Sequence, residues 1–148
     1  MKTSNKGIEL IKRHEGFRSR AYKCPAGIWT IGYGHTRGVK SGDVITEAQG
    51  EMYLRADLNT AEKEVKAHRL ALSQNQFDAL VSFVFNVGSG NFRRSTLLRK
   101  AKANVNDTSI AEEFRKWNKA RNPKTGKLEV LPGLVRRRED ELKLYFEQ

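Results

Sequence analysis

The segment HEGFRSRAYKCPAGIWTIGYGHT, residues 14–36, constrains the fold more than any other part of this sequence. It joins the end of a short amphipathic helical pattern to a glycine-rich, aromatic segment with the alternation typical of a strand. The turn residues CPAG divide it, and a turn between two alternating segments favours an antiparallel hairpin. We therefore expect a lobe over residues 14–46 with a small antiparallel hairpin sheet at residues 17–45, in which the loop HTRGVKSGD can hold a short third strand. Gly32 and Gly34 would let the backbone pass close to another segment.

Glu15 lies at the end of the first helical pattern, and Gly16 after it suits a helix C-terminus. Ile8, Ile11 and Glu15 share one helical face, so the carboxyl group continues an apolar stripe. Partial burial and the negative end of the helix dipole both favour its neutral form. A neutral carboxyl near neutral pH can act as a general acid. The structural alternative is an exposed glutamate held in a salt bridge.

The rest of the chain predicts a long helix and a helical lobe. Thr46 and Gln49 form a capping box before a polar helical pattern over residues 47–68, whose thin apolar stripe suits a helix that bridges two lobes. A second capping box at Ser73 opens a segment that is apolar almost all round, as in a buried core helix of a lobe over residues 73–148. Further helices are expected at residues 95–103, 109–120 and 131–146, with a turn at RNPKTGK.

Three stretches resemble one known family. Glu15, Cys24 and Thr30 follow the spacing E-x8-(D or C)-x5-T, which resembles the catalytic motif of phage-type lysozymes, the endolysins of glycoside hydrolase family 24. The segment TIGYGHT resembles the T-x-G-x-G-H-T signature of the same family. Two segments far from the first also resemble it, FNVGSGNFRRSTLL at residues 85–98 and PGLVRRR at residues 132–138.

The resemblance implies a single lysozyme-like domain over residues 1–148. Its fold would be α+β, with a small antiparallel sheet lobe and a mainly helical lobe joined by a long helix, and with the cleft between them. The implied activity is that of a lysozyme-type glycoside hydrolase, a phage endolysin that cuts the β-1,4 bond between N-acetylmuramic acid and N-acetylglucosamine in peptidoglycan. A lytic transglycosylase and a non-catalytic basic module that binds cell wall or nucleic acid are the alternatives.

The resemblance also implies roles for individual residues. Glu15 would protonate the leaving oxygen, and Thr30 would hold the attacking water. Cys24 takes a position where most relatives have aspartate, so its role stays open between base, nucleophile, redox switch and small turn residue. Lys23 and the positive net charge favour the thiolate, which is the reactive form of a cysteine. The implied substrate-binding residues are Phe85, Asn86, Phe92 and Ser95.

The chain carries 28 basic and 17 acidic residues, and a net charge of +11 attracts anionic polymers. The basic residues are scattered, and the densest group, residues 136–138, is followed at once by three acids, which indicates a salt-bridged helix. We therefore expect no specific nucleic-acid partner. The expected partner is the peptidoglycan glycan strand, with electrostatic contact to an anionic cell envelope, and the protein is expected to be a monomer.

Several features are expected to be absent. No apolar run approaches the ~18 residues of a membrane helix, and the N-terminus has no signal-peptide pattern. We thus expect synthesis in the host cytoplasm and action on the cell wall after release by another factor. One cysteine excludes an internal disulfide. The histidines at 14, 35 and 68 lack metal-ligand spacing, so neither a metal nor a cofactor is expected, and His35 is interpreted as structural.

Overall fold

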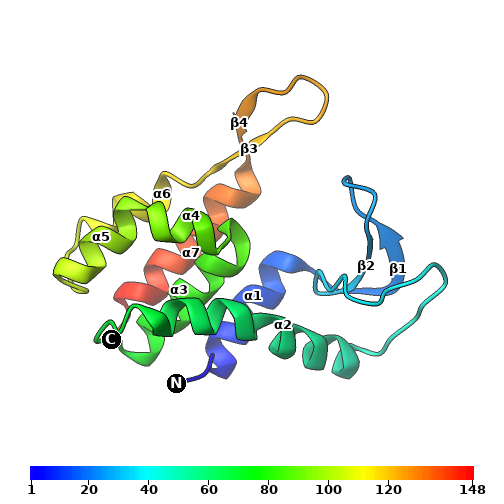
Figure 1. The fold of residues 1–148 in the computed structure, drawn as a ribbon, viewed down its shortest axis with the longest axis horizontal. Coiled ribbons are helices and arrows are strands. Elements are labelled where there is room, and N and C mark those ends of the chain that lie inside the picture. Colours follow the sequence, from blue (N-terminus) through cyan, green and yellow to red (C-terminus); the bar gives the residue numbers. More distant parts are fainter. The chain divides into compact units, whose positions relative to one another are not determined.

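The computed structural model describes all 148 residues and consists of helices with two small antiparallel sheets (Figure 1). It divides into two compact units, a sheet unit over Ile11–Thr60 and a helical unit made of Met1–Leu10 and Ala61–Gln148. The α+β class predicted from the sequence is confirmed. The elements are α1 (Asn5–Glu15), β1 (Arg18–Lys23), β2 (Trp29–Gly32), α2 (Glu47–Ala67), α3 (Gln74–Val87), α4 (Ser89–Arg94), α5 (Thr96–Ala103), α6 (Ile110–Arg115), β3 (Lys119–Arg121), β4 (Leu128–Val130) and α7 (Pro132–Phe146).

The sheet unit contains the predicted hairpin. β1 and β2 pair antiparallel, with Tyr22 opposite Thr30 and Lys23 opposite Trp29. The expected third strand is reduced to one isolated bridge between Arg20 and Val44, flanked by backbone hydrogen bonds. The segment HTRGVKSGD, residues 35–43, is rich in glycine and polar residues. These are poor strand formers, so strand pairing does not extend beyond the bridge.

Both predicted capping boxes are present. In the sheet unit, the Gln49 amide donates to Thr46 Oγ1 at 3.1 Å, and the Gln49 side chain accepts from the Thr46 amide at 2.9 Å. In the helical unit, Ser73 and Gln76 make the same reciprocal pair at the start of α3. Such a pair satisfies two backbone donors that a helix N-terminus would otherwise leave unbonded.

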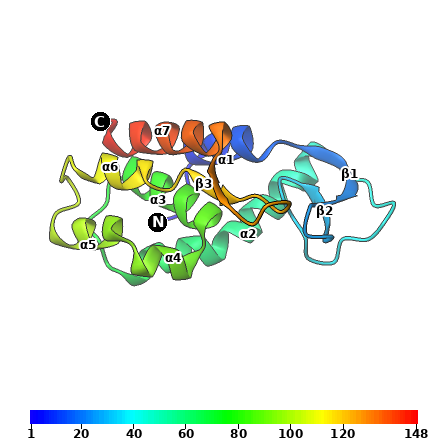
Figure 2. The same cartoon turned by 90° about the horizontal axis from the view of Figure 1, so that it is seen from above.

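The core of the helical unit forms around α3, which packs along α7 (Figure 1 and Figure 2). Phe83 of α3 is fully buried and makes edge-on contacts with Phe92, Phe114 and Trp117, at centroid distances of 6.3, 5.4 and 5.8 Å. Such edge-to-face pairs stabilise a core beyond the area that they bury. The apolar pattern of residues 77–87 thus predicted a core helix correctly.

The predicted helix over residues 109–120 is wrong in its second half. α6 ends at Arg115, and residues 119–121 form β3, which pairs with β4 on the far side of the RNPKTGK turn. The amide of Leu131 donates to the Asn118 carbonyl at 3.0 Å and closes the base of this hairpin. A local pattern misses this outcome because the strand partner lies beyond the turn.

The cluster of residues 136–138 in α7 is salt-bridged as predicted, but two of its members are buried. Arg137 Nε and Arg138 Nε lie 3.3 and 2.8 Å from the carboxylate of Glu141, which is 0% exposed. Ser82 donates to the same carboxylate at 2.6 Å, and Arg138 also donates to Asn86 Oδ1 at 2.8 Å. This group is therefore a buried polar network of the helical unit.

Candidate functional site

Glu15 is the last residue of α1 and is half-buried. The Gly16 amide donates to the Lys12 carbonyl at 2.9 Å and ends the helix there. Ile8 and Ile11, on the same face of the helix, are buried, which confirms the predicted apolar stripe. Glu15 therefore ends the helix on the face that carries this apolar stripe.

Gly34 brings the glycine-rich segment against Glu15. A Cβ atom at Gly34 would lie 3.2 Å from Glu15 Oε1, and the φ of Gly34 is +81°, a conformation that favours glycine. A Cβ at Gly32 would likewise meet Ile45 at 3.2 Å. The expectation that these two glycines allow close backbone approach is confirmed. The acid at the end of α1 thus faces the segment that follows β2.

Cys24 and Thr30 lie together on the hairpin. Cys24 follows β1, and its amide donates to the Ile28 carbonyl at 3.0 Å across a three-residue loop. Thr30 in β2 is buried, and its hydroxyl donates to the same carbonyl at 3.0 Å. Cys24 and Thr30 therefore share one acceptor, the Ile28 carbonyl, which holds both residues at the loop between β1 and β2.

Hydrogen bonds to the Cys24 sulfur favour its thiolate. The backbone of Ile28 is the largest cause that lowers the pKa of Cys24 below its ordinary value, against a smaller opposing effect of burial. The backbone of Ala26 lowers the pKa further. The sequence had suggested Lys23 as the cause, but its ammonium lies over the Trp29 ring, 5.4 Å from the centroid. The hydrogen bonds of the loop, and not the neighbouring lysine, are therefore the main cause of the lowered pKa of Cys24.

A cationic residue that sequence reasoning missed holds this unit together. Lys12, one turn before Glu15, donates to Glu51 and to Glu47, the latter at 2.9 Å, and Tyr33 also donates to Glu47 at 3.2 Å. Burial opposes the charge of Lys12, but these hydrogen bonds outweigh burial and hold its pKa above the usual value. The partners lie 35 and 39 residues away in the sequence, so no local pattern could reveal them.

We expect Lys12→Met to destabilise the protein by about 1–3 kcal/mol near neutral pH, because it leaves Glu51 without its strongest partner. The hydrogen bond from Lys12, followed by that from Arg55, lowers the pKa of Glu51. A lowered carboxyl pKa stabilises the fold above the unfolded pKa, and this contribution disappears as the pH falls through the folded pKa. Urea unfolding over a pH series should therefore show the loss shrinking in acid.

Lys40→Met, at an exposed position of the same unit, serves as the control and should change the unfolding free energy little at any pH. A Lys12→Met deficit that stays constant from neutral to acidic pH would contradict the ionic origin of the effect.

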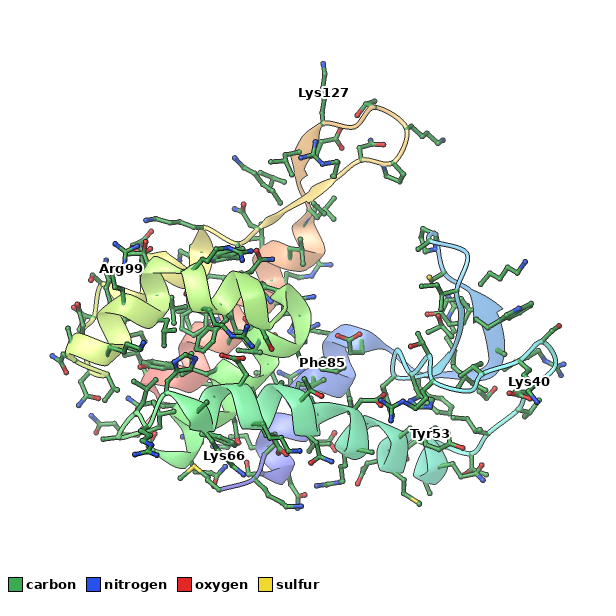
Figure 3. All side chains as sticks on the ribbon, viewed as in Figure 1. Lys40, Tyr53, Lys66, Phe85, Arg99 and Lys127 are labelled. Carbon is green, nitrogen blue, oxygen red and sulfur yellow. The ribbon has the colours of Figure 1, made fainter.

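The four implied substrate-binding residues all lie in the helical unit, and they differ in exposure. Phe85, labelled in Figure 3, lies near the end of α3 and is half-buried. Asn86, the next residue, is exposed. Phe92 is 0% exposed and packs on Phe83, and Ser95 is 6% exposed. The Ser95 hydroxyl accepts from the Leu98 amide at 3.1 Å as the N-cap of α5. Phe92 and Ser95 thus support the fold of this unit.

His35 has the structural role interpreted from the sequence. Its ring stacks on Tyr53 with centroids 4.4 Å apart, and its Nδ1 lies 2.8 Å from Asp57 Oδ2. A pocket of about 370 Å³ in the sheet unit is lined by these two rings and by the loop over residues 37–45, but not by Glu15, Cys24 or Thr30.

No group of three His, Cys, Asp or Glu side chains is arranged to hold a metal ion. None of the helices combines the length and the apolar character that a membrane crossing requires.

Known proteins match this chain over its full length. The phage lysozyme family matches residues 12–141. The endolysin of Acyrthosiphon pisum secondary endosymbiont phage 1 is 48% identical over 147 residues, which cover 98% of each chain. The muramidase domain of SpmX from Asticaccaulis excentricus is 40% identical with a TM-score of 0.91, covering 99% of both chains. The endolysin of Escherichia coli O157:H7 phage FAHEc1 is 38% identical with a TM-score of 0.91, covering 99% of this chain and 94% of that one.

The family match spans most of the sequence and includes the positions of Glu15, Cys24 and Thr30. The relatives in sequence and in structure are endolysins and a muramidase domain. This chain therefore belongs to the phage lysozyme family.

Proposed function

We propose that this chain is a hydrolytic muramidase, which cleaves the β-1,4 bond between N-acetylmuramic acid and N-acetylglucosamine in peptidoglycan and thereby lyses a bacterial host. The observation that carries the proposal is the position of Glu15 against Gly34, in the segment that continues from Thr30 and the Cys24 loop. A glycosidase needs a proton donor and a second group that acts at the sugar carbon. Membership of the phage lysozyme family supports the same reaction.

Glu15 is the proton donor in this proposal. Its carboxyl group sits at the C-terminal end of α1 and is half-buried, next to Gly34 of the segment that follows β2. The neutral acid transfers its proton to the glycosidic oxygen as the bond to that oxygen breaks. The departing sugar leaves as an alcohol.

Cys24 provides the second group as a thiolate. The hydrogen bonds that lower its pKa give it negative charge at a pH where an ordinary cysteine is mostly neutral. As a base it would take a proton from a water held by Thr30, and as a nucleophile it would attack the sugar carbon itself. Attack by water inverts the anomeric configuration, whereas a covalent intermediate retains it. Proton NMR of freshly released products distinguishes the two.

Substitution of Cys24 tests its role. Cys24→Ser is expected to lower the rate of wall clearing by about 10²–10⁴-fold, because a serine hydroxyl does not ionise in this range. Cys24→Asp should stay active and should keep its activity to a lower pH than the parent, because an aspartate ionises near pH 3.9. The parent should lose activity as the pH falls through the lowered pKa of Cys24. Turbidity clearing of purified cell walls over a pH series measures all three.

Two results would contradict this role. If Cys24→Ser clears walls as the parent does, the thiol is a spectator and the loop has only a structural function. If Cys24→Asp and the parent lose activity at the same acidic pH, the ionisation of another group causes the loss of activity in acid. Circular dichroism and thermal unfolding of each variant verify that the hairpin is intact.

The chemical outcome is tested on the released fragments. Hydrolysis adds one water to each cleaved bond and leaves a reducing N-acetylmuramic acid end. A lytic transglycosylase would leave an anhydro end and a mass lower by one water. We expect mass spectrometry of a complete digest to show the hydrolytic products, and anhydro ends throughout would overturn the hydrolytic assignment.

We further propose that the surface at Phe85 and Asn86 contacts the glycan strand, since these two of the four implied residues reach solvent. Arg138 fixes the Asn86 side-chain oxygen, which leaves the amide nitrogen of Asn86 as the group that can donate to a sugar or peptide oxygen. We also expect synthesis in the host cytoplasm, a monomeric state, and attraction of the +11 chain to the anionic envelope that weakens with salt.

A further inference from the structure

The hairpin of β3 and β4 extends outward from the N-terminal end of α7 in the helical unit (Figure 1). Its turn is ordered by backbone hydrogen bonds from the Asn122 amide to the Lys127 carbonyl and from the Gly126 amide to the Asn122 carbonyl, both 2.8 Å long. Every residue from 123 to 131 is exposed. Lys127 points away from the helices at the outer part of the hairpin (Figure 3).

The two faces of this hairpin differ in chemistry. Lys119 lies opposite Val130 and Arg121 opposite Leu128, and cross-strand partners share a face. These four residues form what we call the basic-apolar face: Lys119, Arg121, Leu128 and Val130. The opposite face carries Ala120 and Glu129, the only acid of the hairpin, which accepts from the Asn122 side chain at 3.3 Å.

The aliphatic side chains of the basic-apolar face are largely exposed to solvent. Leu128 and Val130 are 59% and 53% exposed, and Leu131 at the base of the hairpin is 39% exposed. Large aliphatic side chains grouped on a protruding element with no cover indicate an interaction surface. A two-stranded hairpin alone is marginally stable, and Leu128 and Val130 add little buried apolar area to stabilise this one.

The chemistry of the face points to one kind of partner. Between residues 119 and 130 the hairpin has four basic residues and one acid, so a second copy of the same face would be repelled. Single-stranded nucleic acids are bound through a basic groove together with aromatic side chains that stack on the bases, and the hairpin has no aromatic residue. Cations beside aliphatic side chains match a surface that is anionic outside and apolar beneath, namely an anionic phospholipid bilayer.

We propose that the basic-apolar face docks on anionic phospholipid membranes, with Leu128 and Val130 in the headgroup region and the basic side chains at the lipid phosphates. The interaction is peripheral, and it needs neither a membrane-spanning helix nor the acid at Glu15. It would hold the protein at a membrane surface next to the wall, and it is separable from bond cleavage.

The test is co-sedimentation of the full chain with vesicles. The parent should bind vesicles of phosphatidylglycerol and phosphatidylethanolamine and should bind pure phosphatidylcholine vesicles much less. Lys119→Gln with Arg121→Gln should lower the partition coefficient roughly 30-fold, because each basic residue near an anionic surface strengthens binding about fivefold. Leu128→Thr with Val130→Thr keeps strand-forming residues and should lower it about tenfold or more.

The matched control is Lys63→Gln with Lys102→Gln, at exposed positions of α2 and α5, which removes the same charge elsewhere in the helical unit. It should lower vesicle binding much less than the hairpin variants. Equal losses in both charge variants, or parental binding by the Leu128 and Val130 variant, would overturn the proposal. So would hairpin variants that lose binding to isolated peptidoglycan while they keep vesicle binding, or a parent dimer in sedimentation equilibrium that these variants dissociate. Thermal unfolding establishes that each variant is folded.

Discussion

Replacing Glu15 with glutamine is expected to abolish the clearing of a peptidoglycan suspension while the protein stays folded. Glutamine has nearly the shape of the glutamic acid side chain but has no proton to give to the glycosidic oxygen. General acid catalysis contributes about 10²–10⁴-fold to a rate, so the residual clearing should be at or below one per cent of the parent, as an order of magnitude. No other acid is proposed to protonate the leaving oxygen, so the variant has no substitute for this step.

Glu9→Gln is the matched control, because Glu9 lies on the same helix at an exposed position. It should leave clearing near the parental rate. Circular dichroism and the urea midpoint of both variants should match those of the parent within the range of a surface substitution. A folded Glu15→Gln protein that clears walls as fast as Glu9→Gln would remove Glu15 from the mechanism and, with it, the proposed assignment of the acid.

Replacing Glu141 with glutamine is expected to give the largest loss of stability. Its carboxylate is fully buried and faces two guanidinium groups, those of Arg137 and Arg138, and it accepts from Ser82. Removing one partner of a buried ion pair leaves uncompensated charge and typically costs about 3–5 kcal/mol. Urea unfolding followed by circular dichroism should show a lower midpoint with an unchanged denaturant dependence.

Glu139→Gln on the same helix is the comparison. Glu139 pairs with Arg115 at 2.6 Å, but both side chains are partly exposed, at 34% and 43%. Exposed pairs contribute about 0–1 kcal/mol because water and salt screen them. If the two variants lose similar unfolding free energies, burial does not strengthen the ion pairs of Glu141. The buried network would then stabilise the protein no more than a surface ion pair does.

Contacts within one short segment were predictable from the sequence. The two capping boxes join residues three positions apart, so residue type and spacing are sufficient to place them. The same holds for Pro132 at the first position of α7, where the fixed φ of proline suits a helix start. The buried face of α3 followed from an apolar pattern that continues around the helix.

Contacts between distant segments were not predictable. The partners of Lys12 lie on α2, and β3 forms only because residues 128–130 return to it across a turn. The burial of Phe92 depends on its contact with Phe83 of α3, so the motif that contains Phe92 could not separate surface residues from supporting ones. Likewise, the depression of the Cys24 pKa comes from the backbone of the loop, which residue types alone do not describe.

The sequence by itself determined the helical and hairpin segments, the spacing of Glu15, Cys24 and Thr30, and the family, because each of these depends on residue type at a fixed separation along the chain. Only the tertiary structure decided which charges are buried, what surrounds the thiol, and that one hairpin face is both basic and apolar. Burial, hydrogen bonding and cross-strand pairing are set by atoms from segments that meet only after folding. The pKa of Cys24 and the composition of the basic-apolar face therefore depend on contacts that form only in the folded protein.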